Sequence, residues 1–360
     1  MEDALVAKEI IIVTISMGND GAERVLSELS REWIREGNKV TIVQTGAGNY
    51  GVSYELDNKI EIINIRAKSG FKPLRYLQEI QGLIKVLKQR PNAVVVSFIV
   101  SSIFLCGVAS LFVKNKIVVS ERNNPKECPA GKLQQKLRDW AFTKADVCVF
   151  QTEYAKKMFP KSVQKKGIII PNPINGNLPE RYVGERRKAI VAACRLHPQK
   201  NLPMLIEAFY LIHKSYPEYI LEIYGQGAEK EKIENLAKKL GIEDRIYMPG
   251  FIDNILDKIN SAAMYVSSSD YEGISNSMLE ALALGVPSVV TDCPVGGARM
   301  MINDGENGIL VPVGDATKFA QSMDRILRDK EFAEKLSTNA YRIREKLPLK
   351  AIAQEWLKLM

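Results

Sequence analysis

Alternating strand-like and helix-like segments run along nearly all of the 360 residues and constrain the fold more than any other feature. Short apolar runs rich in Val and Ile are followed by longer amphipathic stretches, first over residues 9–170 and again over 189–359. Continuous apolar runs are typical of strands buried in a parallel sheet with helices on both faces. The sequence therefore predicts an α/β protein built from doubly wound parallel sheets.

The expected elements fall into two sets. In the first set, strands cover 9–15, 39–45, 60–65, 93–99, 116–120, 146–150 and 167–170, and helices cover 22–36, 74–90, 102–113 and 132–143. In the second set, strands cover 189–193, 220–224, 245–248, 264–267, 288–291 and 309–311, and helices cover 202–215, 229–240, 276–284, 317–329, 331–344 and 351–359. Each set is sufficient for one open sheet.

The stretch 171–176, with two prolines and a glycine, interrupts the alternation in the manner of an exposed linker. A chain of this length also exceeds the usual size of one core. We therefore expect two Rossmann-like domains, residues 1–173 and 174–345, that face each other across a cleft. Residues 346–360 are expected to form a helix that packs back on the first domain. A ligand should bind in the crevice at the carboxyl ends of the strands.

Positive charge is concentrated in the first half of the chain. Residues 1–166 contain 26 Lys and Arg against 17 Asp and Glu, a net charge of +9, whereas residues 167–360 contain 24 against 25, a net charge of −1. A basic face suits nucleic acid, anionic lipid or a diphosphate, and scattered solvated lysines are the alternative. The absence of an aromatic-plus-basic motif argues against RNA or DNA, which leaves an anionic membrane surface, a diphosphate or solvated lysines as the interpretations of this charge.

Residues 94–113 contain no charged side chain over a length that could cross a bilayer. The segment begins with three valines and has serines in its middle, so we expect a buried strand over 93–99 and a short helix over 102–113. A membrane span is the alternative. No basic segment precedes an apolar stretch at the start of the chain, so no signal peptide is expected.

The cysteines and histidines predict no metal site. The five cysteines lie at positions 106, 128, 148, 194 and 293, and the two histidines at 197 and 213. A zinc site needs clustered ligands, and these are scattered. Scattered thiols fit a reducing compartment, so we expect a cytoplasmic protein.

The segment 268–280 follows an expected strand and opens an expected helix. Gly273 allows a close backbone turn, and Ser275 is a candidate N-cap. Free N–H groups at such a helix start suit a phosphate. Glu272 precedes the helix, and Glu280 lies within it among apolar residues, where a carboxylate needs a partner or an open face. Two carboxylates around a phosphate site suit polyhydroxylated groups; ordinary helix-start and surface glutamates are the alternative.

A second cluster, residues 194–201, also lies between a strand and a helix. Arg195 and Lys200 bracket a short loop at the same edge of the same expected sheet. Two cations there suit a diphosphate, with Arg acting through its planar fork and Lys as a point charge. A solvated loop is the alternative.

Two glycine-bearing turns are weaker signals. Residues 16–23 join the first strand to the first helix, and the Gly225-Gln226-Gly227 turn follows a strand of the second set. Neither is a GxGxxG fingerprint, and no acidic residue at the end of the second strand suits a ribose. This pattern argues against a dinucleotide cofactor.

Together these motifs resemble a retaining glycosyltransferase of family 4 with the GT-B fold, as found in enzymes that build bacterial cell-surface polysaccharides and lipid-linked oligosaccharides. The Glu272-x7-Glu280 spacing matches the donor signature of that family, and the Arg-x4-Lys pair upstream matches its basic residues. The loop 16–21 and the run 303–311 match further family segments. The resemblance covers nearly the whole chain.

The resemblance implies a role for each matching position. The first domain would bind the acceptor and the second the nucleotide-sugar. Glu280 would bind the ribose hydroxyls, Glu272 the donor sugar, and Arg195 and Lys200 the leaving diphosphate. The implied donor-binding residues are Gly21, Gly273, Ile274, Ser275, Asn276 and Glu280. The implied catalytic residues are Arg195, Lys200, Glu272 and Arg122.

Arg122 marks a departure from the family pattern. Many members place a histidine in the loop after the fifth strand, where this chain has Arg122 within residues 120–125. This argues against a histidine base and favours catalysis by charge stabilisation. Arg122 is expected either to reach the donor or to form a structural ion pair with Glu121 or Asp20.

We therefore expect an enzyme that transfers a hexose or N-acetylhexosamine from a nucleotide-sugar, with UDP as the expected nucleotide, to a saccharide acceptor carried on a polyprenyl diphosphate. The resemblance implies retention of anomeric configuration, no cofactor and no metal requirement, with the enzyme at the inner face of the cell membrane. The alternatives are a non-catalytic nucleotide-sugar-binding protein, a GT-B-like epimerase and a phosphorylase.

Overall fold

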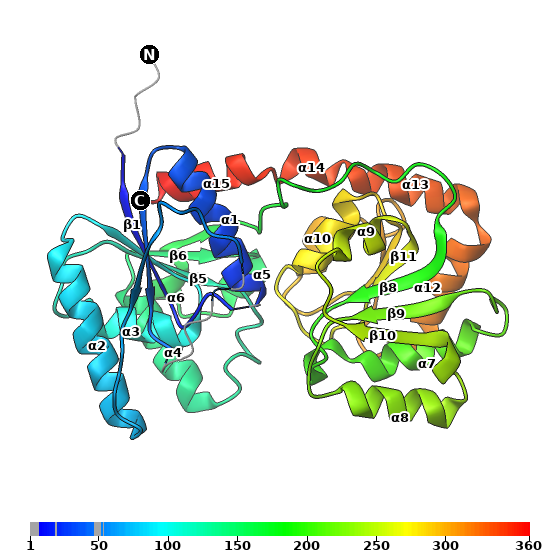
Figure 1. The fold of residues 1–360 in the computed structure, drawn as a ribbon, viewed down its shortest axis with the longest axis horizontal. Helices are drawn as coiled ribbons and strands as arrows, with labels where there is room; N and C mark the ends of the chain where they lie inside the picture. The colour runs from blue at the N-terminus through cyan, green and yellow to red at the C-terminus, as the bar shows by residue number, and fades with distance from the viewer. Residues whose placement is uncertain (1–6, 19, 47–51, 53) are drawn as a thin grey trace, which may run out of the picture. The chain divides into compact units, whose positions relative to one another are not determined.

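The computed structural model describes residues 7–18, 20–46, 52 and 54–360. The chain forms two compact units, as Figure 1 shows. Unit 1 comprises Met1–Pro173 together with Leu349–Met360, and unit 2 comprises Ile174–Pro348. Residues 346–348 therefore belong to unit 2, and only the last helix of the chain returns to unit 1.

Seven parallel strands form the sheet of unit 1, in the order β3-β2-β1-β4-β5-β6-β7. The strands are β1 (Glu9–Thr14), β2 (Lys39–Gln44), β3 (Glu61–Asn64), β4 (Val94–Ser97), β5 (Ile117–Glu121), β6 (Val147–Phe150) and β7 (Gly167–Ile169). The central strands are fully buried because helices cover both faces of the sheet. The order reverses between β1 and β4, which places a topological switch point there.

The helices of unit 1 are α1 (Gly21–Arg35), α2 (Lys72–Gln89), α3 (Val100–Ala109), α4 (Lys132–Lys144), α5 (Glu153–Lys157), α6 (Lys161–Gln164) and α15 (Leu349–Lys358). Helix α15 packs on α1. There the indole Nε1 of Trp33 donates a hydrogen bond to the carbonyl of Ala353 at 3.1 Å, and Trp356 is fully buried. Thr152 caps α5 by accepting a hydrogen bond from the Ala155 amide at 3.0 Å.

Six parallel strands form the sheet of unit 2, in the order β10-β9-β8-β11-β12-β13. They are β8 (Arg187–Ala193), β9 (Ile220–Tyr224), β10 (Ile246–Gly250), β11 (Ala262–Ser267), β12 (Ser288–Thr291) and β13 (Ile309–Val311). The helices are η1 (Pro198–Lys200), α7 (Leu202–Ile212), α8 (Lys230–Leu240), η2 (Glu243–Arg245), α9 (Ile255–Asn260), α10 (Asn276–Ala283), α11 (Gly297–Met301), α12 (Ala316–Arg328), α13 (Lys330–Tyr341) and α14 (Ile343–Lys346).

The apolar segment 94–113 forms strand β4 and helix α3, which spans ten residues. Helix α3 ends at Ala109, earlier than expected, and Leu111 and Phe112 follow it in exposed positions. In the part of the chain that the structure describes, no helix combines the length and the apolar character that crossing a bilayer requires.

Two further differences from the expected elements lie in unit 2. The single helix expected over 331–344 is two helices, α13 and α14, which meet at Arg342. Helices α9 and α11 were not expected, because segments of five or six residues are too short to show a clear period.

Candidate functional site

The candidate site lies where strands β8 and β11 of unit 2 end. These strands are parallel neighbours, and the strand order reverses between them, with β9 and β10 on one side and β12 and β13 on the other. Ligands bind outside the carboxyl ends of strands at such a switch point. The loop after β8 contains Arg195 and Lys200, and the loop after β11 leads through Glu272 into α10. The fold thus brings two sequence-predicted clusters together.

Lys200 and Glu272 form the main polar contact between these two loops. The Nζ of Lys200 donates a hydrogen bond to Oε2 of Glu272, which also accepts one from the Ser269 hydroxyl at 3.3 Å. The side chains are 13% and 21% exposed, so this ion pair is partly withdrawn from water. Burial alone would lower the pKa of Lys200, but the Glu272 carboxylate raises it, so the net pKa is above its ordinary value. The ammonium therefore stays charged at neutral pH.

Three more hydrogen bonds tie the same two loops together. The backbone amide of Asp270 donates to the carbonyl of Gln199 at 2.9 Å, and the side-chain amide of Gln199 donates to the carbonyl of Tyr271 at 2.8 Å. The side-chain amide of Asn201 donates to Oδ1 of Asp270 at 2.6 Å. Gln199 and Asp270 were not among the predicted site residues, because nothing in their local sequence shows that the two loops meet.

Asn201 also sets the turn that carries Lys200. Its backbone is left-handed, with a φ of 41°, which is unusual outside glycine but tolerated by Asn. Its side chain accepts a hydrogen bond from the Met204 amide at 3.3 Å and so caps α7. The turn at η1 and the cap at Asn201 together fix where the Lys200 side chain begins.

The glycine turn after β9 packs against the Arg195 loop. A Cβ on Gly225 would lie 1.9 Å from the carbonyl oxygen of Cys194, and one on Gly227 would lie 2.2 Å from the carbonyl oxygen of Leu196. The Leu196 amide donates a hydrogen bond to the carbonyl of Gln226 at 2.8 Å. These glycines therefore allow two backbones to approach closely, a structural role that the weak glycine spacing alone did not reveal.

The start of α10 has the capping residue and the buried glycine that the sequence predicts there. Ser275 is its N-cap, with extended backbone geometry, and its hydroxyl accepts a hydrogen bond from the Met278 amide at 3.4 Å. Gly273 is buried, and a Cβ on Gly297 would lie 1.9 Å from its carbonyl oxygen. Gly297 was not among the predicted site residues; its part is to let the loop after β12 reach the Gly273 turn.

The remaining predicted residues of unit 2 differ in exposure. Ile274 is 4% exposed, and Ser275 and Asn276 are partly exposed. Glu280 is 4% exposed within α10 and has an interaction partner, as a buried carboxylate requires. Arg195 is exposed and also has a partner. Lys200 and Arg195 thus occupy different environments, one largely buried and one at the surface.

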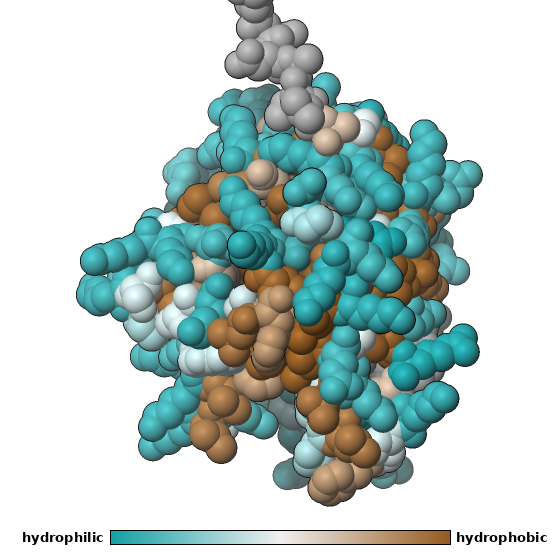
Figure 2. All heavy atoms as spheres, turned by 90° about the vertical axis from the view of Figure 1, so that its left-hand side faces the viewer, coloured by the Kyte–Doolittle hydropathy of each residue, from teal (hydrophilic) through white to brown (hydrophobic). Residues whose placement is uncertain are grey.

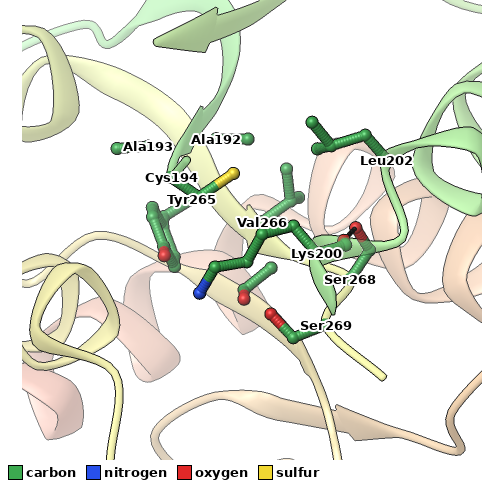
Figure 3. A pocket seen from close by; sticks show the side chains of 10 residues that line it. Ala192, Ala193, Cys194, Lys200, Leu202, Tyr265, Val266, Ser268 and Ser269 are labelled. Carbon is green, nitrogen blue, oxygen red and sulfur yellow. Dashed lines mark hydrogen bonds between the residues drawn. The ribbon is translucent and has the colours of Figure 1, made fainter. Parts of the chain in front are cut away.

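A small pocket lies between the ends of β8 and β11 (Figure 3). Its lining residues are Ala192, Ala193, Cys194, Lys200, Leu202, Tyr265, Val266, Ser267, Ser268 and Ser269. In Figure 3 the Lys200 side chain crosses this pocket, and its amine points between Tyr265 and Ser269. The pocket has a volume of about 10 Å³, which is room for about one water molecule and too small for a nucleotide-sugar.

Unit 1 contains the two other predicted site residues. Gly21 is the first residue of α1, after the loop that begins at Ser16. The cap residue Asp20 has a backbone amide that donates to Oε2 of Glu23 at 3.0 Å. Asn19 of this loop lies outside the described residues.

Arg122 follows β5 and is held by aromatic stacking. Its guanidinium carbon lies 4.1 Å from the centre of the Phe98 ring and 5.3 Å from that of Trp356 on α15, and its Nη1 donates to Oδ1 of Asn172 at 2.8 Å. Its Nε and Nη2 are buried and have no hydrogen-bond partner among the residues that the structure describes. Burial lowers the pKa of Arg122 to about 9, although Glu121 acts in the opposite direction.

Neither structural ion pair considered for Arg122 is present in the described part of the chain. Glu121 instead accepts hydrogen bonds at Oε1 from the amides of Arg122 and Asn123, both at 3.0 Å. Burial raises the pKa of Glu121 to about 7, despite the nearby Arg138. Stacking therefore replaces ion pairing as the interaction that positions Arg122.

Over the described residues, no group of three or more His, Cys, Asp or Glu side chains is arranged to hold a metal ion. The cations that the candidate site offers to an anionic ligand are those of Arg195 and Lys200. Burial raises the pKa of Cys194 to about 11, so this thiol beside the site is neutral.

Comparisons with known proteins match both units. The family model described as Glycosyltransferase Family 4 matches residues 19–177, and that described as Glycosyl transferases group 1 matches residues 179–343. An uncharacterized glycosyltransferase of Haemophilus influenzae is 26% identical over 359 residues, which cover 97% of this chain and 99% of the relative.

One further homologous sequence and one solved structure are similar to this protein over nearly the whole chain. A Campylobacter jejuni enzyme, GalNAc-alpha-(1->4)-GalNAc-alpha-(1->3)-diNAcBac-PP-undecaprenol alpha-1,4-N-acetyl-D-galactosaminyltransferase, is 25% identical over 357 residues, with 97% of each chain covered. The crystal structure of Anabaena HepE in complex with UDP superimposes with a TM-score of 0.84 at 16% identity, covering 97% of this chain and 98% of that chain.

The two family models together span almost the entire chain, and each unit has the parallel, doubly wound sheet of a Rossmann-like domain. We conclude that this protein is an enzyme of glycosyltransferase family 4 with the GT-B fold.

Proposed function

We propose that this enzyme transfers a hexose or N-acetylhexosamine from a UDP-sugar to a saccharide acceptor carried on a polyprenyl diphosphate, with retention of the anomeric configuration. The observation that carries the proposal is the Lys200–Glu272 ion pair at the switch point between β8 and β11, beside the capped start of α10. It sets a cation and a carboxylate beside the capped start of a helix. A nucleotide-sugar presents complementary groups in a diphosphate and sugar hydroxyls.

In this proposal each group has a defined task. Arg195 and Lys200 neutralise the negative charge that develops on the leaving diphosphate, and the N–H groups at the start of α10 bind its oxygens. Glu272 accepts hydrogen bonds from the donor sugar, and Lys200 orients that carboxylate as well as contacting the diphosphate. Glu280 accepts hydrogen bonds from the ribose hydroxyls. With two cations at the diphosphate, we propose that no divalent metal is required.

The acceptor oxygen then attacks the anomeric carbon on the face from which the diphosphate departs, and its proton passes to a leaving phosphate oxygen. The C–O bond to UDP breaks as the new glycosidic bond forms, so configuration is retained and UDP is released. Arg122 is not a base at neutral pH, since its pKa of about 9 leaves it mostly protonated. This fits catalysis by charge stabilisation without a side-chain base.

The UDP and polyprenyl parts of the proposal take support from similar proteins. HepE was crystallised with UDP, and the name of the Campylobacter enzyme includes a saccharide on PP-undecaprenol. The basic first half of the chain, with its net charge of +9, also suits an enzyme that meets its acceptor at an anionic membrane on the cytoplasmic side.

A transfer assay tests the proposal. The purified chain is incubated with UDP-glucose, UDP-galactose, UDP-N-acetylglucosamine or UDP-N-acetylgalactosamine, and with a short-chain polyprenyl-diphosphate saccharide, with and without EDTA. We expect a glycosylated acceptor whose new linkage has the α configuration by proton NMR, equally in both conditions. A β linkage, a strict need for metal, or an epimerised UDP-sugar formed without acceptor would each contradict it.

A further inference from the structure

Tyr265 of strand β11 holds a hydroxyl group in the interior of unit 2. Hydrophilic side chains ordinarily lie at the surface, as they do over much of the side of unit 1 that Figure 2 shows. Tyr265 is only 1% exposed, so its hydroxyl needs a hydrogen-bond partner inside the protein. That partner is the hydroxyl of Ser277, at 2.8 Å. The contact joins β11 to the first turn of helix α10.

A second hydrogen bond continues from Ser277 to the cap of α10. The hydroxyls of Ser277 and Ser275 lie 3.2 Å apart, and the Ser275 hydroxyl accepts a hydrogen bond from the Met278 amide at 3.4 Å. Both serines are partly exposed, whereas Tyr265 is buried. We name Tyr265, Ser277 and Ser275 the hydroxyl chain, because their O–H groups lead from the interior to the surface at the start of α10.

The hydroxyl chain has one hydrogen more than it uses internally. Burial raises the pKa of Tyr265, so this hydroxyl keeps its hydrogen at neutral pH and donates it to Ser277. The two serines then share one hydrogen bond, in which either of them can be the donor. Whichever serine donates, the hydrogen of the other has no acceptor among the residues that the structure describes. One O–H group at the start of α10 is therefore left to bond to water or to a ligand.

Tyr265 also borders the cation of the candidate site. It lines the small pocket that the Lys200 side chain crosses, and the Lys200 amine points between Tyr265 and Ser269 (Figure 3). An ammonium and an O–H group are both donors that suit phosphate oxygens. Tyr265 thus contacts the start of α10 and borders the pocket of Lys200, the two parts of unit 2 to which the proposed function assigns the diphosphate.

We propose that Tyr265 is a positioning residue for the diphosphate of the nucleotide-sugar and acts through the hydroxyl chain. Its hydroxyl orients Ser277, and the serine hydrogen that remains is donated to a phosphate oxygen. The inference rests on the proposed function, because it needs a diphosphate at the start of α10. The alternative is a hydroxyl chain that only stabilises the fold, with the remaining serine hydrogen bonded to water.

A comparison of UDP with uridine tests the inference, because uridine has the same base and ribose and no phosphate. UDP is titrated calorimetrically, and uridine is measured by its displacement of labelled UDP. The variants are Tyr265→Phe, which keeps the ring and removes the hydroxyl, Ser277→Ala, and the two combined. The matched control is Tyr224→Phe, at a tyrosine of the same sheet that is 4% exposed and donates to Glu222 at 2.9 Å.

We expect Tyr265→Phe and Ser277→Ala each to weaken UDP binding about fivefold, which is the typical contribution of one hydrogen bond. The combined variant should bind UDP within about twofold of either single variant, because both substitutions remove the same contact. Uridine should bind all variants as it binds the unaltered chain. Tyr224→Phe should leave UDP affinity unchanged while it lowers stability in urea by an amount similar to that of Tyr265→Phe.

Three results would overturn the inference. They are unchanged UDP affinity in both single variants, an equal loss of affinity for UDP and uridine, and losses that multiply in the combined variant. In each of these cases the unaltered chain still binds UDP, so the proposed function stands. If the unaltered chain binds neither UDP nor uridine, the proposed function falls and the inference falls with it.

Discussion

Replacement of Lys200 by Met should reduce turnover far more than it reduces stability. The substitution keeps most of the unbranched side chain and removes the ammonium group that contacts Glu272. Removing one preorganised charge partner at such a site typically costs a factor of about 10²–10³ in kcat, which corresponds to about 3–4 kcal/mol of transition-state stabilisation. We expect a loss of that order in kcat/KM for the UDP-sugar.

The effect on folding follows from the environment of the pair. Breaking a fully buried ion pair by removing one partner costs about 3–5 kcal/mol. Here the side chains are 13% and 21% exposed, so water can still reach the remaining carboxylate, and we expect a loss of about 2 kcal/mol in the free energy of unfolding. The double variant Lys200→Met/Glu272→Gln removes both charges and should recover most of this loss while remaining inactive.

The assay combines steady-state kinetics with urea unfolding. The matched control is Lys230→Met on α8, whose ion pair with Glu234 has both side chains about half exposed; it should cost less than about 0.5 kcal/mol and leave kcat/KM unchanged. Near-wild-type turnover in Lys200→Met would refute the proposed role in diphosphate binding. A double variant that regains activity along with stability would show that the lysine acts only on the fold.

Three further predictions concern other parts of the chain. Arg195→Ala should lower kcat/KM by about 10²–10³ with a change in unfolding free energy below about 0.5 kcal/mol, because the residue is exposed; unaltered kinetics would exclude it from the site. Glu121→Gln should stabilise the protein, because burial raises the pKa of Glu121 from its ordinary 4.5 to about 7 in the folded state, so the wild type loses stability as the pH rises from about 4.5 to about 7. The gain in unfolding free energy of the variant should be near zero below pH 4.5 and on the order of 3 kcal/mol above pH 7. Urea unfolding at several pH values measures it. Trp356→Ala should destabilise unit 1 by about 3–5 kcal/mol and should lower kcat, because Arg122 loses the ring on which it stacks. Trp356→Phe keeps an aromatic ring there and should restore kcat. Equal kcat in the two variants would contradict the role of stacking in positioning the guanidinium.

Local patterns in the sequence were sufficient to predict the strands of both sheets and most of the helices. The Val-rich run of β4 and the amphipathic period of α1 predict their elements because burial imposes those patterns locally. The break at Arg342 between α13 and α14 has no proline or glycine to mark it, so the sequence predicted one helix. The position of a helix end, such as that of α3 at Ala109, depends on which other residues pack against the last turn. Local sequence patterns do not reveal those packing partners.

The candidate site was predictable in its parts and not in its contacts. Arg195, Lys200 and Glu272 were identified because they lie in segments that follow a strand, and Glu280 because a carboxylate among the apolar residues of a helix needs a partner or an open face. That Lys200 pairs with Glu272, 72 residues further along the chain, depends on β8 and β11 being neighbours, which only the fold determines. The stacking of Arg122 on Trp356 likewise depends on α15 returning to unit 1.

The most direct test of the account is a calorimetric titration of UDP into the unaltered chain and into Glu280→Ala. The account holds that the carboxyl ends of β8 and β11, with the start of α10, bind a nucleoside diphosphate, and that the buried carboxylate of Glu280 binds its ribose. We expect the unaltered chain to bind UDP and the variant to bind it at least tenfold more weakly, since losing a charged hydrogen-bond acceptor costs about 1.5–3 kcal/mol. Equal affinity in the two proteins, with both folded by circular dichroism, would contradict the ribose role, and no binding of UDP or GDP would contradict the site itself.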